Sequence, residues 1–199
     1  DFVNANKVEV PYVVNEADIS ILNDTTKFRV LDLTSSSTKA SYFHNSVLGY
    51  HAAKLSNYDA LLKFYISKNH MPVLNMLNVK YFISKNDNEK IKAFINEDAQ
   101  GNAWFVKDLF YLKDQNEAIL ALDTLNLINS AVSTKLKSKK FNVPVNAKID
   151  LINHTSNYLK YSSSNKEEGY AVFSEIFYSE GWKVLVNGKE TVFDNVNVA

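Results

Sequence analysis

The sequence predicts an α+β fold, in which a mixed α/β part with a small sheet covered by helices precedes an antiparallel β-sandwich or jelly-roll-like module. Apolar residues recur at both helical and strand spacings up to about residue 140. From Asn146 onward the pattern has a period of two, and helix signals are few. A Lys-rich run separates the two patterns. We therefore expect a mixed α/β subdomain at residues 1–140 and a sandwich-like subdomain at residues 141–199.

Three segments of the first part have strand character. Phe28–Leu33 is a short apolar run followed by a hydroxyl cluster from Thr34 to Thr38, which predicts a buried strand and then a loop. Asn78–Ser84 and Ala103–Leu112 are rich in β-branched and aromatic residues, which favours one strand in each. We expect these strands to form the small sheet.

Two helices are predicted in the same part. Between Ala52 and Ser67, apolar residues recur at spacings of three and four and so share one helical face, which we expect to cover the sheet. These residues are Leu55, Tyr58, Leu61, Leu62 and Tyr65. Asp114 is followed by Glu117 three residues later and then by an apolar stripe, which is typical of a capped helix start.

The last part predicts five short antiparallel strands. They are Ala147–Asn153, Tyr158–Ser163, Tyr170–Phe177, Trp182–Val186 and Glu190–Phe193. Asn187 and Gly188 separate the last two, and this pair favours the left-handed torsions of a tight hairpin turn.

Composition excludes some classes of function. The chain is 46% hydrophobic, so it can bury a large core. Its 22 basic residues balance 22 acidic ones and include a single arginine, Arg29, which disfavours binding to nucleic acid. The run Lys135, Lys137, Lys139 and Lys140 is interpreted as a solvated connector.

Several catalytic and cofactor chemistries have no matching residues. The chain has no cysteine, which excludes disulfides, thiolate nucleophiles and Cys-based metal sites. It also has no Gly-rich phosphate-binding loop, no G-x-S-x-G motif of a serine nucleophile and no H-E-x-x-H zinc-binding motif. We expect no cofactor and no metal.

No apolar run approaches the roughly 18 residues that span a bilayer. The first residue is Asp1, so we expect that this chain was cut from a longer polypeptide or matured from one, with any membrane anchor outside this sequence.

Asp32 is the first candidate for chemistry. It ends a predicted strand, a place where α/β folds often present catalytic carboxylates. A phosphatase of the haloacid-dehalogenase type would need a second Asp two residues later, where this chain has Thr34. The alternative is a carboxylate that caps the following loop.

The most unusual stretch contains two imidazoles, His44 and His51, with Tyr50 and Lys54 beside them. The imidazoles could share a helical face and bind a metal, but no third ligand stands nearby. Imidazole, phenol and ammonium groups could instead bind an anionic or sugar ligand. The structural alternative is a loop packed against the sheet with its polar groups bonded internally.

Two aromatic segments offer a further binding possibility. Trp104 follows a small-residue turn at Gly101, and Trp182 follows Gly181 in the second module. Aromatic faces stack on sugar rings, whereas core packing is the structural alternative. The candidate ligand-binding residues are His44, Tyr50, His51, Lys54, Trp104 and Trp182.

A series of segments, taken in order along the chain, resembles the YfhO-like family of bacterial polytopic membrane proteins, in a Bacteroidetes-type member. The early segments are Ala17–Leu22, Phe28–Leu33, Ser41–His44, Gly49–Leu55 and Leu74–Tyr81. The later ones are Gly101–Trp104, Phe173–Tyr178 and Gly181–Lys183. Together they extend over nearly the whole chain.

This resemblance implies an extracytoplasmic, periplasmic domain attached to membrane helices similar to those of lipid-linked-sugar glycosyltransferases. In Gram-positive relatives the family is associated with sugar decoration of cell-envelope polymers. Its catalytic carboxylate is expected in a loop between early membrane helices, which this chain does not contain. The implied partners are the transmembrane portion of the parent chain and an envelope glycan or lipid-linked sugar. The family pattern continues past Ala199, so we expect further strands there.

Three functions remain open at this point. The first is an accessory domain that recognises acceptor or shapes the active-site entrance of the parent enzyme. The second is a carbohydrate-binding module that acts on its own through Tyr50, His51, Trp104 and Trp182. The third is a hydrolase that uses Asp32.

Overall fold

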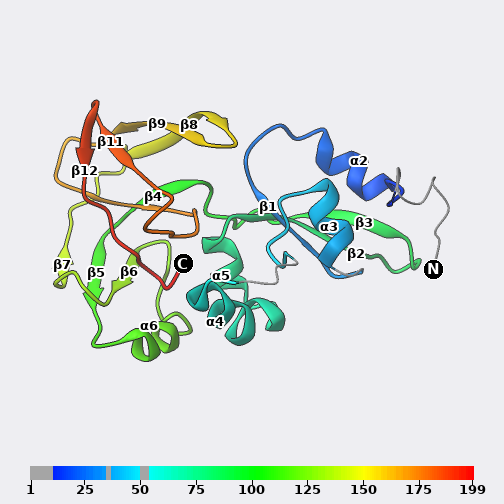
Figure 1. Cartoon of the computed structure of the whole chain (residues 1–199), viewed down its shortest axis with the longest axis horizontal. Coiled ribbons are helices and arrows are strands. Elements are labelled where there is room, and N and C mark those ends of the chain that lie inside the picture. The colour runs from blue at the N-terminus through cyan, green and yellow to red at the C-terminus, as the bar shows by residue number, and fades with distance from the viewer. Residues whose placement is uncertain (1–10, 35–36, 50–53) are drawn as a thin grey trace. The chain divides into compact units, whose positions relative to one another are not determined.

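The chain adopts an α+β fold, as predicted. A computed structural model describes residues 11–34, 37–49 and 54–199 (Figure 1). Its contacts group the chain into two compact units: unit 1 is Asp1–Ala52 with Val79–Asp98, and unit 2 is Ala53–Asn78 with Ala99–Ala199. These two units differ from the predicted subdomains, which had a single boundary between residues 140 and 141.

A three-stranded sheet forms the centre of unit 1. Its strands are β1 (Arg29–Asp32), β2 (Val79–Lys85) and β3 (Ile91–Ile95). They lie in the order β1-β2-β3, with β1 parallel and β3 antiparallel to β2. The strands predicted at 28–33 and 78–84 are therefore confirmed, whereas β3 was not predicted.

Two short helices, α2 (Glu16–Leu22) and α3 (Ser37–Phe43), pack on this sheet, and α3 begins inside the predicted loop at 34–38. A capping box starts α2. The Asn15 side chain accepts a hydrogen bond from the Asp18 backbone N–H, and the Asp18 carboxylate accepts one from the Asn15 N–H, each at 2.9 Å. This exchange satisfies two donors that the first turn of a helix otherwise leaves unpaired.

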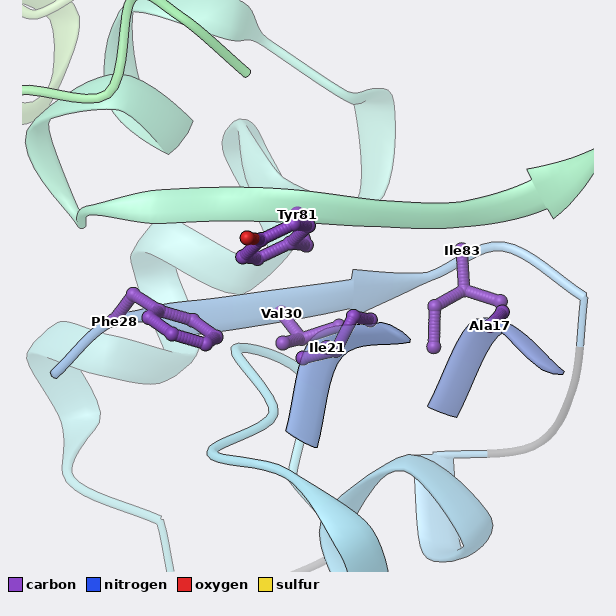
Figure 2. Packing of buried hydrophobic residues seen from close by; sticks show 6 residues of the cluster. All are labelled: Ala17, Ile21, Phe28, Val30, Tyr81 and Ile83. Atoms are coloured by element: carbon purple, nitrogen blue, oxygen red, sulfur yellow. The ribbon is translucent and has the colours of Figure 1, made fainter. Parts of the chain in front are cut away.

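One apolar cluster fixes α2 against the sheet (Figure 2). Its members are Ala17, Ile21, Phe28, Val30, Tyr81 and Ile83. The rings of Phe28 and Tyr81 lie 5.0 Å apart in a tilted arrangement. Burying a large apolar side chain stabilises a fold by about 1.5–3 kcal/mol, so this cluster is the main support for the position of α2.

The described residues of unit 2 form four helical segments. They are α4 (Ser56–Phe64), the 3-10 turn η1 (Ile66–Lys68), α5 (Met71–Met76) and α6 (Gln115–Ala121). The first two confirm the helix predicted at 52–67, and the hydroxyl of Tyr65 between them donates to the Ile119 carbonyl of α6. The side chain of Asp114 accepts from the N–H groups of Asn116 and Glu117, which confirms the predicted cap.

The single strand predicted at 103–112 is wrong, because the chain forms two strands there that join different sheets. β4 (Ala103–Val106) pairs antiparallel with β10 (Tyr170–Phe173). β5 (Asp108–Tyr111) pairs parallel with β6 (Ser130–Ser133) and antiparallel with β7 (Lys139–Lys140). The break falls at Lys107, whose backbone N–H donates to the Asn129 carbonyl.

The remaining strands form two hairpins. They are β8 (Lys148–Thr155) with β9 (Tyr158–Ser164), and β11 (Val184–Val186) with β12 (Lys189–Thr191). Asn187 and Gly188 have φ angles of 52° and 78°, which confirms the left-handed turn. Each hairpin is a separate two-stranded sheet, so the sandwich stays a prediction.

The segment 195–199 is held to β6 by its own asparagine. The Asn197 N–H donates to the Val132 carbonyl, and the Val132 N–H donates to Asn197 Oδ1, both at 2.9 Å. Val198, the next residue, is buried and has a φ of 64°, a torsion that a β-branched residue rarely adopts.

Candidate functional site

An open depression of about 320 Å³ lies in unit 1, where the end of α2, the segment before β1 and the end of α3 meet. Its lining residues are Ile21, Leu22, Asp24, Thr26, Phe28, Ser41, Tyr42, Phe43, His44 and Asn45. One of the predicted ligand-binding residues, His44, therefore belongs to it.

His44 is fixed by a carboxylate from another helix. Its Nε2 lies 3.0 Å from Asp18 Oδ1, and the side chains of both residues are at most 3% exposed. The Lys39 ammonium lies 3.1 Å from the other oxygen of Asp18. Because Asp18 also caps α2, one carboxylate ties the start of α2 to the end of α3.

The pKa of Asp18 reflects these bonds. Burial raises the pKa of this carboxyl, but the hydrogen bonds from the Asn15 backbone, His44 and Lys39 outweigh burial and hold it below the ordinary value. The carboxylate is thus charged at neutral pH and serves as the acceptor of this cluster.

A second carboxylate, Asp24, is bonded on both of its oxygens. One oxygen accepts from the Lys80 ammonium at 2.6 Å and the Tyr81 hydroxyl at 2.9 Å. The other accepts from the backbone and hydroxyl of Thr26. Burial raises the pKa of Asp24, yet the bonds from Lys80, Thr26 and Tyr81 lower it well below the ordinary value.

Tyr42 supplies an exposed aromatic face to the depression. The residue is 54% exposed, and its ring stands edge-on to the rings of Tyr12 and Phe43, at centroid distances of 5.6 and 4.9 Å. Such contacts hold a ring in place while leaving one of its surfaces open to a ligand.

The polar groups around this depression differ in how they are bonded. Asp18 and Asp24 already accept bonds from basic groups, and His44 is fixed by one of them, so these groups act as structural anchors. The open ring of Tyr42 and the side-chain amide of Asn45 are the groups that a ligand would meet. The Asn45 amide donates to the Phe28 carbonyl through a long contact of 3.5 Å.

The other predicted site residues lie elsewhere or outside the described ranges. Lys54, Trp104 and Trp182 belong to unit 2, and Tyr50 and His51 fall outside the described residues. Lys54 is exposed, whereas Trp104 is buried in β4. The indole of Trp182 donates to the Ile176 carbonyl at 3.0 Å.

Asp32 occupies the loop-capping position described for it. Its Oδ1 accepts from the backbone N–H of Thr34 at 2.8 Å and from the Thr34 hydroxyl at 2.7 Å. The residue is buried at the end of β1. This geometry is the local turn that Asp commonly forms with a residue two positions later.

Sequence reasoning missed the two carboxylates that organise the site. Asn15 followed by Asp18 is a capping-box pattern and could have predicted α2. Asp24 followed by Thr26 could likewise have predicted a turn. Their partners His44 and Lys80 are 26 and 56 residues away, and no local pattern links them.

Within the described ranges, no three His, Asp or Glu side chains gather in a way that could hold a metal ion. None of the helices in those ranges has the length and apolar character needed to cross a membrane. No family model, curated protein or solved structure matches this chain.

Proposed function

We propose that this chain is a non-catalytic recognition domain that binds a saccharide at the unit 1 depression. In the wider setting, it is the extracytoplasmic accessory domain of a membrane protein resembling lipid-linked-sugar glycosyltransferases. There it presents an envelope glycan or lipid-linked acceptor to the parent enzyme.

The single observation that carries the saccharide proposal is the exposed ring of Tyr42 at a polar depression. Sugar rings have an apolar C–H face that stacks on aromatic side chains and a rim of hydroxyl groups that need hydrogen-bond partners. Tyr42 offers the first kind of contact, and Asn45, Ser41 and Thr26 line the same depression with polar groups.

The anchoring of the carboxylates supports recognition over catalysis. A general acid or base needs a proton that it can exchange with substrate near neutral pH. Asp18 and Asp24 have lowered pKa values and are bonded to Lys39 and Lys80, so each remains an ionised acceptor. They give the depression a fixed shape, which lowers the entropy cost of binding.

The test is a glycan-array screen of the 199-residue chain, followed by calorimetric titration of the best ligand. Tyr42→Ala is expected to weaken that ligand about tenfold, the equivalent of the roughly 1.4 kcal/mol that ring stacking contributes. Tyr42→Phe keeps the ring and is expected to retain most of the affinity.

Tyr158→Ala is the matched control, because Tyr158 is 53% exposed and lies in unit 2. The saccharide proposal fails if no envelope glycan binds, or if the Tyr42→Ala and Tyr158→Ala variants lose the same affinity.

The membrane setting has its own test. The full-length parent, reconstituted with a polyprenyl-phosphate sugar, is expected to transfer the sugar to an envelope acceptor. In this assay Tyr42→Ala should raise KM for the acceptor and leave KM for the donor unchanged. Absence of transfer to every envelope acceptor would contradict the glycosyltransferase setting, while the binding result for the isolated chain would stand.

A further inference from the structure

A second depression, of about 270 Å³, lies wholly within unit 2 and plays no part in the saccharide proposal. It is lined by Phe64, Tyr65, Lys68, His70, Leu120 and Asp123. These residues come from the end of α4, from η1 and the residues after it, and from the end of α6. Its volume is at the small end of ligand pockets, which suits a ligand about the size of one amino acid.

Several contacts join the residues that line this second depression. The rings of Tyr65 and His70 pack together with a centroid distance of 4.8 Å. The Tyr65 hydroxyl is bonded to the Ile119 carbonyl, and His70 Nε2 lies 3.0 Å from Asp123 Oδ1. One oxygen of Asp123 thus faces His70, while its side chain remains 65% exposed and open to a ligand.

Two opposite charges line this depression without neutralising each other. Asp123 pairs with His70, and in the described part of the chain the Lys68 ammonium forms no ion pair. Phe64 and Leu120 line the same depression and are 48% and 64% exposed. The depression therefore combines an open carboxylate, an open ammonium and an apolar rim.

We propose that this second depression binds a small zwitterion with an apolar side chain, such as an apolar α-amino acid. The ligand ammonium would donate to Asp123, and the ligand carboxylate would accept from Lys68. The apolar side chain would cover Phe64 and Leu120, removing exposed apolar surface from water. A neutral sugar satisfies neither charge, and a simple anion satisfies only Lys68.

The test uses the 199-residue chain and amide chemical-shift mapping by NMR. L-leucine at millimolar concentration is expected to shift resonances of residues 64–70 and 118–124. Leucinamide, N-acetyl-leucine and glycine, which lack the carboxylate, the ammonium and the side chain respectively, should each bind at least tenfold more weakly.

Two substitutions locate the charges. Lys68→Gln and Asp123→Asn should each weaken leucine at least tenfold, and the amide introduced by Asp123→Asn would still offer an oxygen to His70, so the fold is preserved. Lys166→Gln and Asp87→Asn change exposed charges elsewhere and should leave leucine affinity unchanged. The proposal is overturned if leucine shifts none of these resonances, or if the two neutralised analogues bind as well as leucine.

Discussion

The β1-β2-β3 sheet of unit 1 and the β11–β12 hairpin of unit 2 are both built from short strands but are supported in different ways. In the sheet, Val30, Leu31 and Ile83 are almost completely buried, and α2 covers one face. In the hairpin, Leu185 and Val186 are more than half exposed. Apolar strand residues thus stabilise this chain only where another element covers them, since the hydrophobic effect requires removal from water.

Replacement of a core residue should give the largest difference in unfolding free energy between the sheet and the hairpin. Ile83→Ala removes a side chain that is 1% exposed and leaves a cavity under α2, so we expect a loss of about 4 kcal/mol of unfolding free energy. Leu185→Ala in the hairpin should cost less than about 0.5 kcal/mol. Urea unfolding of both variants measures these two losses of unfolding free energy. Equal losses would contradict the view that only covered strand residues stabilise the chain.

The buried carboxylate should give the next largest effect. Asp18→Ala removes the partner of His44 and Lys39 and one half of the capping box, so we expect a loss of about 3 kcal/mol at pH 7. Asp150→Ala in β8 removes a carboxylate that pairs with Lys148 at the surface and should cost at most about 1 kcal/mol. Thermal unfolding of the two variants at neutral pH compares these losses.

The Asp18 contribution should depend on pH in a defined direction. Because folding lowers the pKa of Asp18 from 3.8, its stabilisation is complete above that value and is lost as the pH falls below it. The difference between the wild-type chain and the Asp18→Ala variant should therefore shrink on acidification below about pH 4. If the difference in stability between the wild-type chain and the Asp18→Ala variant grows on acidification, the Asp18 carboxylate is not the group that supplies the stabilisation.

The hairpin turn should give the smallest effect. Gly188 has a φ of 78°, and a Cβ added there would meet no atom within 4 Å. Gly188→Ala should therefore cost only the torsional penalty of about 1 kcal/mol, confined to β11 and β12. Amide hydrogen exchange of Val184–Val186 should accelerate while exchange in β2 stays unchanged. A global loss of stability would mean that the hairpin supports the core.

Local patterns predicted those elements whose cause is local. The apolar run of β1, the Asp114 cap and the Asn187-Gly188 turn each depend on neighbouring residues, and each was found in the sequence. β6 was missed because its sequence, Ser130–Ser133, has little strand character. It is a strand because its backbone pairs with β5 and its residues are buried.

The candidate site was predictable only in part. His44 was selected from its sequence neighbourhood, and it does line the unit 1 depression. Its partner Asp18 and the Asp24–Lys80 pair could not be predicted, because the fold brings these residues together across 26 and 56 positions. The second depression was missed for the same reason, since His70 and Asp123 are 53 residues apart.

The bonds between Asn197 and Val132 have a consequence for how the molecule behaves at high concentration. β6 is the end strand of the sheet ordered β6-β5-β7, and end strands expose backbone groups on which a second molecule can assemble. Asn197 occupies both the N–H and the carbonyl of Val132. At Val132 the edge strand β6 therefore has no unpaired backbone group to offer to a second molecule, which protects the chain against intermolecular aggregation.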